Sequence, residues 1–324
     1  MANTFPKIVF GGFPIGPNPV SPYFPDQESI EKLYKLLEEG GVDTIDTARL
    51  YGPSEEWIGK TGGGKRFIID SKTPGGFIPG GSTGEAIPQH AKETLQRLGV
   101  DKVDIFYIHA PDPSIPLEDQ LQGINTAYKA GHFKRFGLSN FAPADVQRVY
   151  DICKEKGYPL PTVYQSNYSA VARKNEAVLI PLLRKLGIAF YVYSPIAGGL
   201  LTKTSTQLRE GEGAGRFSKG DGMEALYGGL YNKPSYYTAL DLWAEAAKEA
   251  GCSKAELAYR WVAFDSAVDA KYGDAVIFGA SKHSQVSDTI AWLKRGSVGD
   301  KAKAKIDEIW KVVEHEAPVD NYNK

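Results

Sequence analysis

The feature that most constrains the fold of this chain is a regular alternation of short apolar segments with longer segments of helical period. Amphipathic stretches such as 146–153 separate eight short runs rich in β-branched and aromatic residues. This alternation is typical of strand–helix units around a parallel sheet. Eight units without a break in composition predict a single α/β domain over residues 1–324, a (β/α)8 TIM barrel rather than a doubly wound sheet. The predicted strands are 8–11, 44–47, 67–71, 104–109, 135–139, 162–167, 189–194 and 275–279.

Two segments depart from the repeat. Residues 203–235 are rich in Gly, Ser, Lys and Tyr, which predicts a long lid loop. Residues 301–315 have helical period and predict an extra C-terminal helix. The glycines between 75 and 84 predict a mobile surface loop after the third strand. Gly59-Lys60-Thr61 resembles the end of a phosphate loop, but Ser54 stands where that motif needs its first glycine, so the motif is rejected.

Charge and cysteine content exclude several functional classes. The 38 Lys and Arg residues are balanced by 39 Asp and Glu residues, so no overall field attracts nucleic acid. Cys153 and Cys252 have no metal-type spacing, which predicts no metal site and favours a reducing compartment. The sequence has no apolar run of about 18 residues and no basic segment followed by an apolar run at its start. We therefore expect no membrane association and a cytoplasmic location.

Four polar residues follow or end predicted strands. In a parallel barrel the active site lies at the C-terminal ends of the strands, so these side chains are expected on one face of the molecule. They are Asp46 and Tyr51 in Asp-Thr-Ala-Arg-Leu-Tyr, Lys72 in Asp-Ser-Lys, and His109 in Tyr-Ile-His. Individually each has an ordinary structural explanation, since a strand-end Asp is often a cap and a strand-end His is often structural. Together they predict a catalytic site.

The four residues suit the reduction of a carbonyl group. A free phenol titrates at about 10, and Lys72 close to Tyr51 is expected to lower that pKa. Asp46 within salt-bridge distance would keep Lys72 charged. His109 is expected to donate a hydrogen bond to the substrate carbonyl oxygen while Tyr51 supplies the proton.

Several motifs resemble those of the aldo-keto reductases over almost the whole chain. They are Asp-Thr-Ala-x-x-Tyr-Gly at 46–52, Asp-Ser-Lys at 70–72, Tyr-Ile-His-Ala-Pro-Asp at 107–112, Gly-Leu-Ser-Asn-Phe at 137–141 and Val-Tyr-Gln at 163–165. The resemblance is strongest to the aflatoxin-aldehyde reductase branch. It rests there on Ala-Gly-Gly-Leu-Leu-Thr at 197–202, Gly-Arg-Phe at 215–217 and His-Glu-x-Pro at 315–318.

The resemblance implies an NAD(P)H-dependent carbonyl reductase with Tyr51 as proton donor. It also implies that Ser139, Asn140 and Gln165 hydrogen-bond the nicotinamide carboxamide, and that Tyr193 of the Tyr193-Ser194-Pro segment stacks on the nicotinamide ring. A carboxamide offers both a donor and an acceptor, and an aromatic face leaves one side of the ring free for hydride transfer.

The adenosine end departs from the family pattern. The segment after the last strand lacks the Lys and Arg that many members place on the 2′-phosphate, although the aflatoxin-reductase branch shares this feature. The cofactor residues implied here are Ser281, Lys282, Gln285, Asp288 and Thr289. The lid adds Lys203 and Arg216 as candidates for the pyrophosphate. NADPH is favoured, and NADH stays open.

The substrate is expected to be a small carbonyl compound. Its predicted pocket walls are Phe13, Arg49, Tyr231 and Tyr322. A second hypothesis is a cofactor-binding regulatory subunit, because channel-associated β-subunits share the barrel and the cofactor pocket. A barrel isomerase or hydrolase that uses Asp46 and His109 would leave the other site residues without a purpose. Monomer and homodimer are both open.

Overall fold

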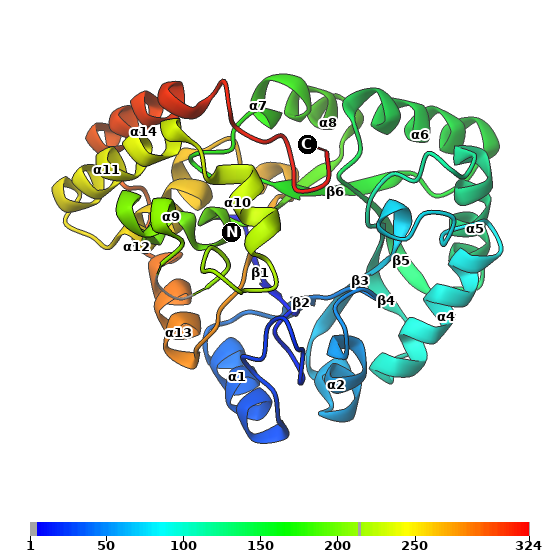
Figure 1. Ribbon diagram of the computed structural model, residues 1–324. Coiled ribbons are helices and arrows are strands. Elements are labelled where there is room, and N and C mark those ends of the chain that lie inside the picture. Colours follow the sequence, from blue (N-terminus) through cyan, green and yellow to red (C-terminus); the bar gives the residue numbers. More distant parts are fainter. Residues whose placement is uncertain (1–4, 213–214, 324) are drawn as a thin grey trace.

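Eight parallel strands close into a barrel in the computed structural model, which describes residues 5–212 and 215–323 (Figure 1). Each strand pairs with the next along the chain, and the last pairs with the first. The predicted (β/α)8 barrel is confirmed, with strand ends within two residues of those expected. The strands are β1 (Lys7–Gly11), β2 (Thr44–Asp46), β3 (Ile68–Thr73), β4 (Val103–Ile108), β5 (Phe133–Ser139), β6 (Pro161–Asn167), β7 (Ala189–Tyr193) and β8 (Ala275–Phe278).

Helices surround the barrel (Figure 1), and their apolar faces are buried in the core between helices and strands. In α1 a capping box joins Asp26 and Ser29 at the N-terminus, and residues at helical spacing face the barrel, namely Ile30, Leu33, Tyr34 and Leu37. The outer helices are α1 (Gln27–Glu39), α2 (Ser54–Lys60), α3 (Gly63–Arg66), α4 (Ala86–Leu98), α5 (Leu117–Lys129), α6 (Pro143–Lys156), α7 (Asn175–Val178), α8 (Ile180–Leu186), α11 (Pro234–Glu249), α12 (Lys254–Arg260), α13 (His283–Trp292) and α14 (Asp300–Val313).

The predicted C-terminal helix 301–315 is confirmed as α14, which packs along α11. The predicted lid is not a structureless loop. It carries α9 (Ser205–Glu210) and α10 (Glu224–Tyr231), and α11 begins before residue 235. Thr204 and Gln207 form a capping box at the start of α9, which is the local signal that the composition of the segment obscured. Residues 213 and 214 of the predicted lid lie outside the described residues.

The glycine-rich segment after β3 is partly buried, contrary to the expected surface loop. Gly75 and Gly76 begin a 3-10 turn, η1 (Gly75–Phe77), which packs on the segment after β4. A Cβ on Gly75 would lie 2.1 Å from the carbonyl oxygen of Ala110, and Gly75 has a positive φ of 57°. The side chain of Ser82 accepts the Gly75 N–H at 2.8 Å. This segment is thereby fixed beside the strand ends.

The barrel interior forms a small core of its own, separate from the layer between strands and helices. Tyr107 on β4 is a large, fully buried side chain in this interior, and its ring lies over Gly137 on β5. A Cβ on Gly137 would lie 2.3 Å from Cδ1 of Tyr107. A glycine at position 137 therefore provides the space for the Tyr107 ring.

We expect Gly137→Ala to lower the free energy of unfolding by about 1–3 kcal/mol, because the methyl group overpacks the interior against Tyr107. Urea unfolding followed by far-UV circular dichroism measures this change. Gly228→Ala in α10 is the matched control, since no atom lies within 4 Å of its added Cβ and alanine favours a helix. Equal stability of the two variants would contradict the packing argument.

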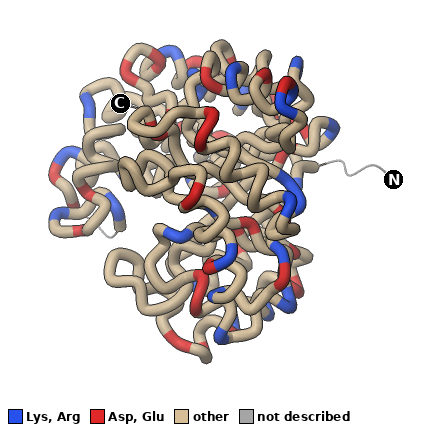
Figure 2. Tube along the Cα trace, turned by 90° about the vertical axis from the view of Figure 1, so that its right-hand side faces the viewer, with Lys and Arg blue, Asp and Glu red and all other residues tan. Residues whose placement is uncertain are grey.

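In the view of Figure 2, Lys and Arg positions are interspersed with Asp and Glu positions along the Cα trace of the described residues. Among the described residues, no helix is both long and apolar enough to cross a membrane. Within the same part of the chain, no group of three or more His, Cys, Asp or Glu side chains is arranged to hold a metal ion.

Candidate active site

The C-terminal ends of β2, β3 and β4 bring Asp46, Lys72 and His109 to one mouth of the barrel. Lys72 is fully buried, and its Nζ donates to Asp46 Oδ2 at 2.6 Å and to the carbonyl oxygen of Thr47 at 2.8 Å. The other oxygen of Asp46, Oδ1, accepts from Gln165 Nε2 at 2.9 Å. The carboxylate is thus held between a cation and an amide, which fixes both side chains.

Tyr51 lies above this pair in the turn after β2. Lys72 Nζ is 5.1 Å from the centroid of the Tyr51 ring, and the Tyr51 and His109 ring centroids are 5.7 Å apart. The four residues predicted to be catalytic are therefore brought together. The first and last of them, Asp46 and His109, are 63 residues apart in the sequence, and the closed barrel brings them close together.

The charge states of these groups are set by burial and by one another. Burial raises the pKa of Tyr51 above its usual value of 10.0, and the Lys72 ammonium only partly offsets this. The expected effect of Lys72, which lowers the pKa of Tyr51, is present, but desolvation of the phenolate outweighs it and the net shift is upward. Tyr51 keeps its proton at neutral pH, which is the form a proton donor needs.

Lys72 and His109 respond to burial in opposite ways. Burial disfavours the Lys72 ammonium, but Asp46 and Tyr51 outweigh that effect and the pKa of Lys72 rises above 10.5. Burial and the nearby Lys72 charge hold the pKa of His109 well below 6.5. His109 is therefore a neutral imidazole beside a charged lysine. Its Nδ1 is buried without a partner among the described residues.

The ends of β5, β6 and β7 carry the residues expected to hold a carboxamide. Asn140 Nδ2 donates to the His109 carbonyl oxygen at 2.9 Å and to Ser139 Oγ at 3.1 Å, and Asn140 Oδ1 accepts from the Tyr193 hydroxyl at 2.9 Å. Asn140 and Ser194 both have positive φ, 62° and 59°, as strained residues at functional strand ends often do.

This arrangement fits a nicotinamide carboxamide. Ser139 Oγ accepts a hydrogen bond and so keeps its own hydrogen for another acceptor. Within residues 5–212 and 215–323, Gln165 Oε1 takes no hydrogen bond, since its amide nitrogen is the atom bound to Asp46. One donor and one acceptor are therefore left at neighbouring strand ends. The half-exposed Tyr193 ring stands next to them.

The predicted adenosine residues lie around the start of α13. Gln285 Oε1 accepts from both the backbone nitrogen and the hydroxyl of Ser281, at 2.8 and 3.0 Å. Lys282 precedes the first helical residue and is exposed, as is Asp288. Thr289 is only 2% exposed and hydrogen-bonds with Tyr259 on α12, so the geometry does not favour contact between Thr289 and a ligand.

The two lid cations differ in their placement. Lys203 is buried, and its Nζ donates to the carbonyl oxygen of Glu212 at 3.3 Å. Arg216 Nη1 donates to the Tyr227 hydroxyl at 2.5 Å, and its guanidinium lies 5.8 Å from the Phe13 ring. Arg216 therefore lies at the barrel mouth beside a ring that itself contacts Tyr51.

The predicted pocket walls differ in their contacts. Phe13 meets Tyr51 edge to face with centroids 5.1 Å apart, and the Tyr322 hydroxyl donates to the Pro111 carbonyl oxygen at 3.1 Å. Arg49 Nη2 is paired with Glu93 on α4 at 2.5 Å, whereas Arg49 Nη1 is buried without a partner among the described residues. Tyr231 is fully buried, and its hydroxyl accepts from Asn167 Nδ2, so the geometry does not favour substrate contact by Tyr231.

Phe77 is a mouth residue that the sequence analysis missed. Its ring centroid is 4.9 Å from that of His109 and 5.0 Å from that of Tyr322, yet 43% of the residue is exposed. The available signal was a large apolar residue shortly after Lys72, within a segment that its glycines assigned to the surface. Phe13, Phe77 and Tyr322 together give the mouth an aromatic wall.

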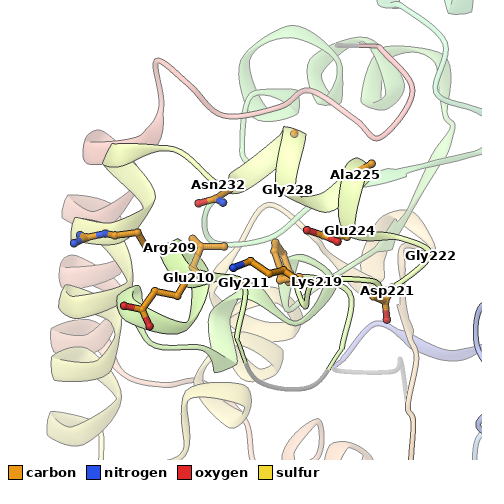
Figure 3. A pocket seen from close by; sticks show the side chains of 13 residues that line it. Arg209, Glu210, Gly211, Lys219, Asp221, Gly222, Glu224, Ala225, Gly228 and Asn232 are labelled. Atoms are coloured by element: carbon orange, nitrogen blue, oxygen red, sulfur yellow. The ribbon is translucent and has the colours of Figure 1, made fainter.

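A separate cavity of about 590 Å³ lies within the lid, not at the strand ends (Figure 3). None of the four predicted catalytic residues lines it. The cavity is lined by charged side chains and backbone groups around α9 and α10, among them Arg209, Lys219, Asp221 and Glu224. The chemistry described above therefore belongs to the barrel mouth, and this cavity is a feature of the lid.

At the mouth of this parallel barrel, a buried Lys–Asp pair lies beneath a neutral tyrosine and a neutral histidine. These groups are typical of an oxidoreductase that acts on carbonyl groups. Comparisons with known proteins agree with this class. The family model described as "Aldo/keto reductase family" matches residues 7–311. The chain therefore belongs to the aldo/keto reductase family, as its motifs predicted.

The matches to curated relatives span most of this chain and most of each relative. Oxidoreductase sirO of Leptosphaeria maculans is 35% identical over 87% of this chain and 86% of that protein. Aflatoxin B1 aldehyde reductase member 2 of Rattus norvegicus is 34% identical over 90% of this chain and 83% of its own. Aflatoxin B1 aldehyde reductase member 4 of Homo sapiens is 34% identical over 87% of this chain and 88% of that protein. The chain is an oxidoreductase for carbonyl groups, and the regulatory alternative is not favoured.

Proposed function

We propose that this chain reduces aldehydes or ketones to alcohols with NADPH, and that Tyr51 donates the proton. The observation that carries the proposal is the position of a neutral Tyr51 above the Lys72–Asp46 ion pair and beside His109. The cofactor supplies the hydride when it is bound. Everything else in the reaction is assigned to side chains of this chain.

Tyr51 and His109 act on the carbonyl oxygen. A neutral imidazole donates one N–H, and the phenol donates its O–H, so the two groups polarise the C=O bond from one side. The proton then moves from the Tyr51 oxygen to the substrate oxygen as the alcohol forms. Lys72 stabilises the resulting phenolate, and Asp46, oriented by Gln165, keeps Lys72 charged.

Ser139, Gln165 and Tyr193 are proposed to hold the nicotinamide. The free donor of Ser139 and the free acceptor of Gln165 match the two ends of a carboxamide. Asn140 donates both of its amide hydrogens to its neighbours, and its Oδ1 accepts from Tyr193 with a second lone pair left over, so we propose that it positions Tyr193 and accepts from the carboxamide. Ser194 shapes the turn after β7 through its positive φ.

NADPH is proposed over NADH because the exposed cation Lys282 follows Ser281 directly and stands near Gln285, at the adenosine end. Arg216, at the mouth, is proposed for the pyrophosphate. A 2′-phosphate adds charge that Lys282 and the backbone N–H groups at the start of α13 would attract. We also propose a cytoplasmic location, where the free cysteines Cys153 and Cys252 would stay reduced.

We expect NADPH to quench tryptophan fluorescence with a Kd at least about tenfold lower than that of NADH, which corresponds to about 1.4 kcal/mol. Lys282→Gln should weaken NADPH binding several-fold and leave NADH binding unchanged, because only NADPH carries the 2′-phosphate. Lys301→Gln on α14 is the matched surface control. Equal affinity for the two cofactors would contradict the preference for NADPH, and tighter binding of NADH would replace NADPH in the proposal.

The proposed substrate class is a small apolar or aromatic aldehyde, since Phe13, Phe77 and Tyr322 form the wall of the mouth. Turnover of 4-nitrobenzaldehyde at saturating cofactor tests it. Cofactor binding without turnover would return the regulatory hypothesis. Gel filtration with light scattering distinguishes the monomer from the homodimer.

A further inference from the structure

The barrel interior directly beneath Lys72 contains a carboxyl group that the reaction does not use. Asp70 lies on β3 two residues before Lys72, so both side chains point to the same, inward side of the strand. Asp70 is fully buried and pairs in register with Asp46 on the adjacent strand β2. One oxygen, Oδ1, accepts from the backbone nitrogen of Ile105 on β4 at 3.1 Å.

Two buried polar atoms of this interior have no partner among the described residues. Asp70 Oδ2 and the Tyr107 hydroxyl are both buried, and neither makes a hydrogen bond to any described residue. Tyr107 also contacts Lys72, whose Nζ is 5.5 Å from the Tyr107 ring centroid. Buried polar atoms are nearly always satisfied, by a proton on one of them or by an ordered water.

The ionic groups that face Asp70 come from five strands, and their pairing leaves Asp70 without a cation. Lys72 is paired with Asp46 at 2.6 Å, and Arg135 on β5 is paired with Asp104 on β4 at 2.6 Å. In the described part of the interior, three carboxyl groups thus face two cations. The remaining facing groups are the phenols of Tyr107 on β4 and Tyr191 on β7.

Burial and the neighbouring charges act on Asp70 in the same direction. Desolvation, Asp46 and Asp104 raise the pKa of Asp70 to about 8, and Arg135 opposes them only in part. Geometry leads to the same state, because Asp70 is buried in register with Asp46 while Lys72 and Arg135 are each paired with another carboxylate. A proton on Asp70 removes a buried negative charge that has no cation of its own.

We propose that Asp70 is a proton-holding positioning residue, which is neutral beneath the Lys72–Asp46 pair at pH 7 and whose ionisation lowers the rate of carbonyl reduction at alkaline pH. The effect on rate rests on the proposed function of Tyr51, whereas the protonation of Asp70 does not. While Asp70 is neutral, Lys72 faces the single carboxylate of Asp46. Loss of the Asp70 proton to solvent places a second negative charge beneath Lys72.

The sign of the effect follows from that second charge. A negative charge beneath Lys72 weakens the positive field at Tyr51, which makes its phenol a weaker acid. Reduction is therefore expected to slow as the pH rises through the pKa of Asp70. The pKa values of Tyr51 and Lys72 lie above their usual 10.0 and 10.5, and that of His109 lies well below 6.5. None of these three groups accounts for a loss of rate between pH 7 and pH 9.

Infrared spectroscopy tests the protonation without any turnover. The wild-type protein should show the C=O stretching band of a protonated carboxylic acid at pH 7, and the band should disappear as the pH rises to 9. Asp70→Asn should lack this band at pH 7. Asp320→Asn, which removes another buried carboxyl with a raised pKa, should retain it. A wild-type spectrum without this band, or a band that remains in Asp70→Asn, would overturn the proposal.

The pH profile of kcat tests the consequence for the reaction. At pH 9 about nine in ten Asp70 side chains are ionised for a pKa of about 8, so wild-type kcat should fall about threefold or more from pH 7. Asp70→Asn, a neutral side chain of the same size, should keep its pH 7 value within about twofold. Asp151→Asn on the surface of α6 should follow the wild type.

The infrared band reports the protonation of Asp70, and the pH profile of kcat reports its effect on the reaction. Identical pH profiles of wild type and Asp70→Asn, with the infrared band present, would refute the positioning role of Asp70. The protonation of Asp70 at pH 7 would still stand. Absence of turnover at every pH, with the band present, would refute the proposed function alone. If Asp70→Asn does not fold, loss of the wild-type band between pH 7 and pH 9 still decides the protonation.

Discussion

Replacing Tyr51 with phenylalanine will lower the kcat for aldehyde reduction by about 10²–10⁴-fold, the usual contribution of a positioned general acid. The substitution removes only the hydroxyl, and the ring keeps its edge-to-face contacts with Phe13 and His109. The Kd for NADPH should therefore change less than about twofold. Steady-state kinetics with 4-nitrobenzaldehyde and fluorescence titration measure the two quantities.

The control for this substitution is Tyr128→Phe, which removes an exposed phenol on α5 and should leave kcat unchanged. A Tyr51→Phe enzyme that retained half of the wild-type kcat would show that another group supplies the proton. His109 would then be the next candidate, because its ring lies beside that of Tyr51.

Replacing Lys72 with methionine will cost about 3–5 kcal/mol in the free energy of unfolding, in addition to most of the activity. Methionine preserves the length of the side chain but leaves Asp46 buried and ionised without a cation. Urea unfolding at pH 7 measures the loss. Lys301→Met on the surface of α14 is the matched control, and its stability should stay within about 0.5 kcal/mol of the wild type.

The double variant Lys72→Met with Asp46→Asn distinguishes charge from packing. Removing both charges should recover most of the lost stability, because a neutral amide does not need the cation. It should recover no activity, because nothing then stabilises the Tyr51 phenolate. If the double variant is as unstable as Lys72→Met alone, the stability came from the shape of the lysine and not from its charge.

The barrel and the gathering of the catalytic residues could be predicted because both depend on local periodicity. Polar residues at the ends of apolar strands meet at one mouth whenever the strands are parallel, so Asp46, Lys72 and His109 follow from the pattern alone. The family motifs around them agreed. Strand period was also a usable signal for Asp70, which stands two residues before Lys72 and so shares its inward side.

The rest depended on contacts that no local pattern records. The pairing of Arg49 with Glu93, 44 residues away, could not be read from any local pattern. The direction of the Tyr51 pKa required knowledge of how much water the fold removes from its ring. Composition assigned the lid to a loop, although the capping box of Thr204 and Gln207 marked a helix start.

The residues that follow α14 reach back across the barrel mouth to the proposed nicotinamide site. Asn323 Nδ2 donates to the backbone carbonyl oxygen of Asn140 at 2.9 Å, and the backbone nitrogen of Asn321 approaches the Tyr193 hydroxyl at 3.4 Å. Tail and site thus share Asn140 and Tyr193. Linkage between two such contacts is reciprocal, so any ligand that stabilises this arrangement of Asn140 and Tyr193 also holds the tail in place, by the same free energy with which the tail favours the ligand.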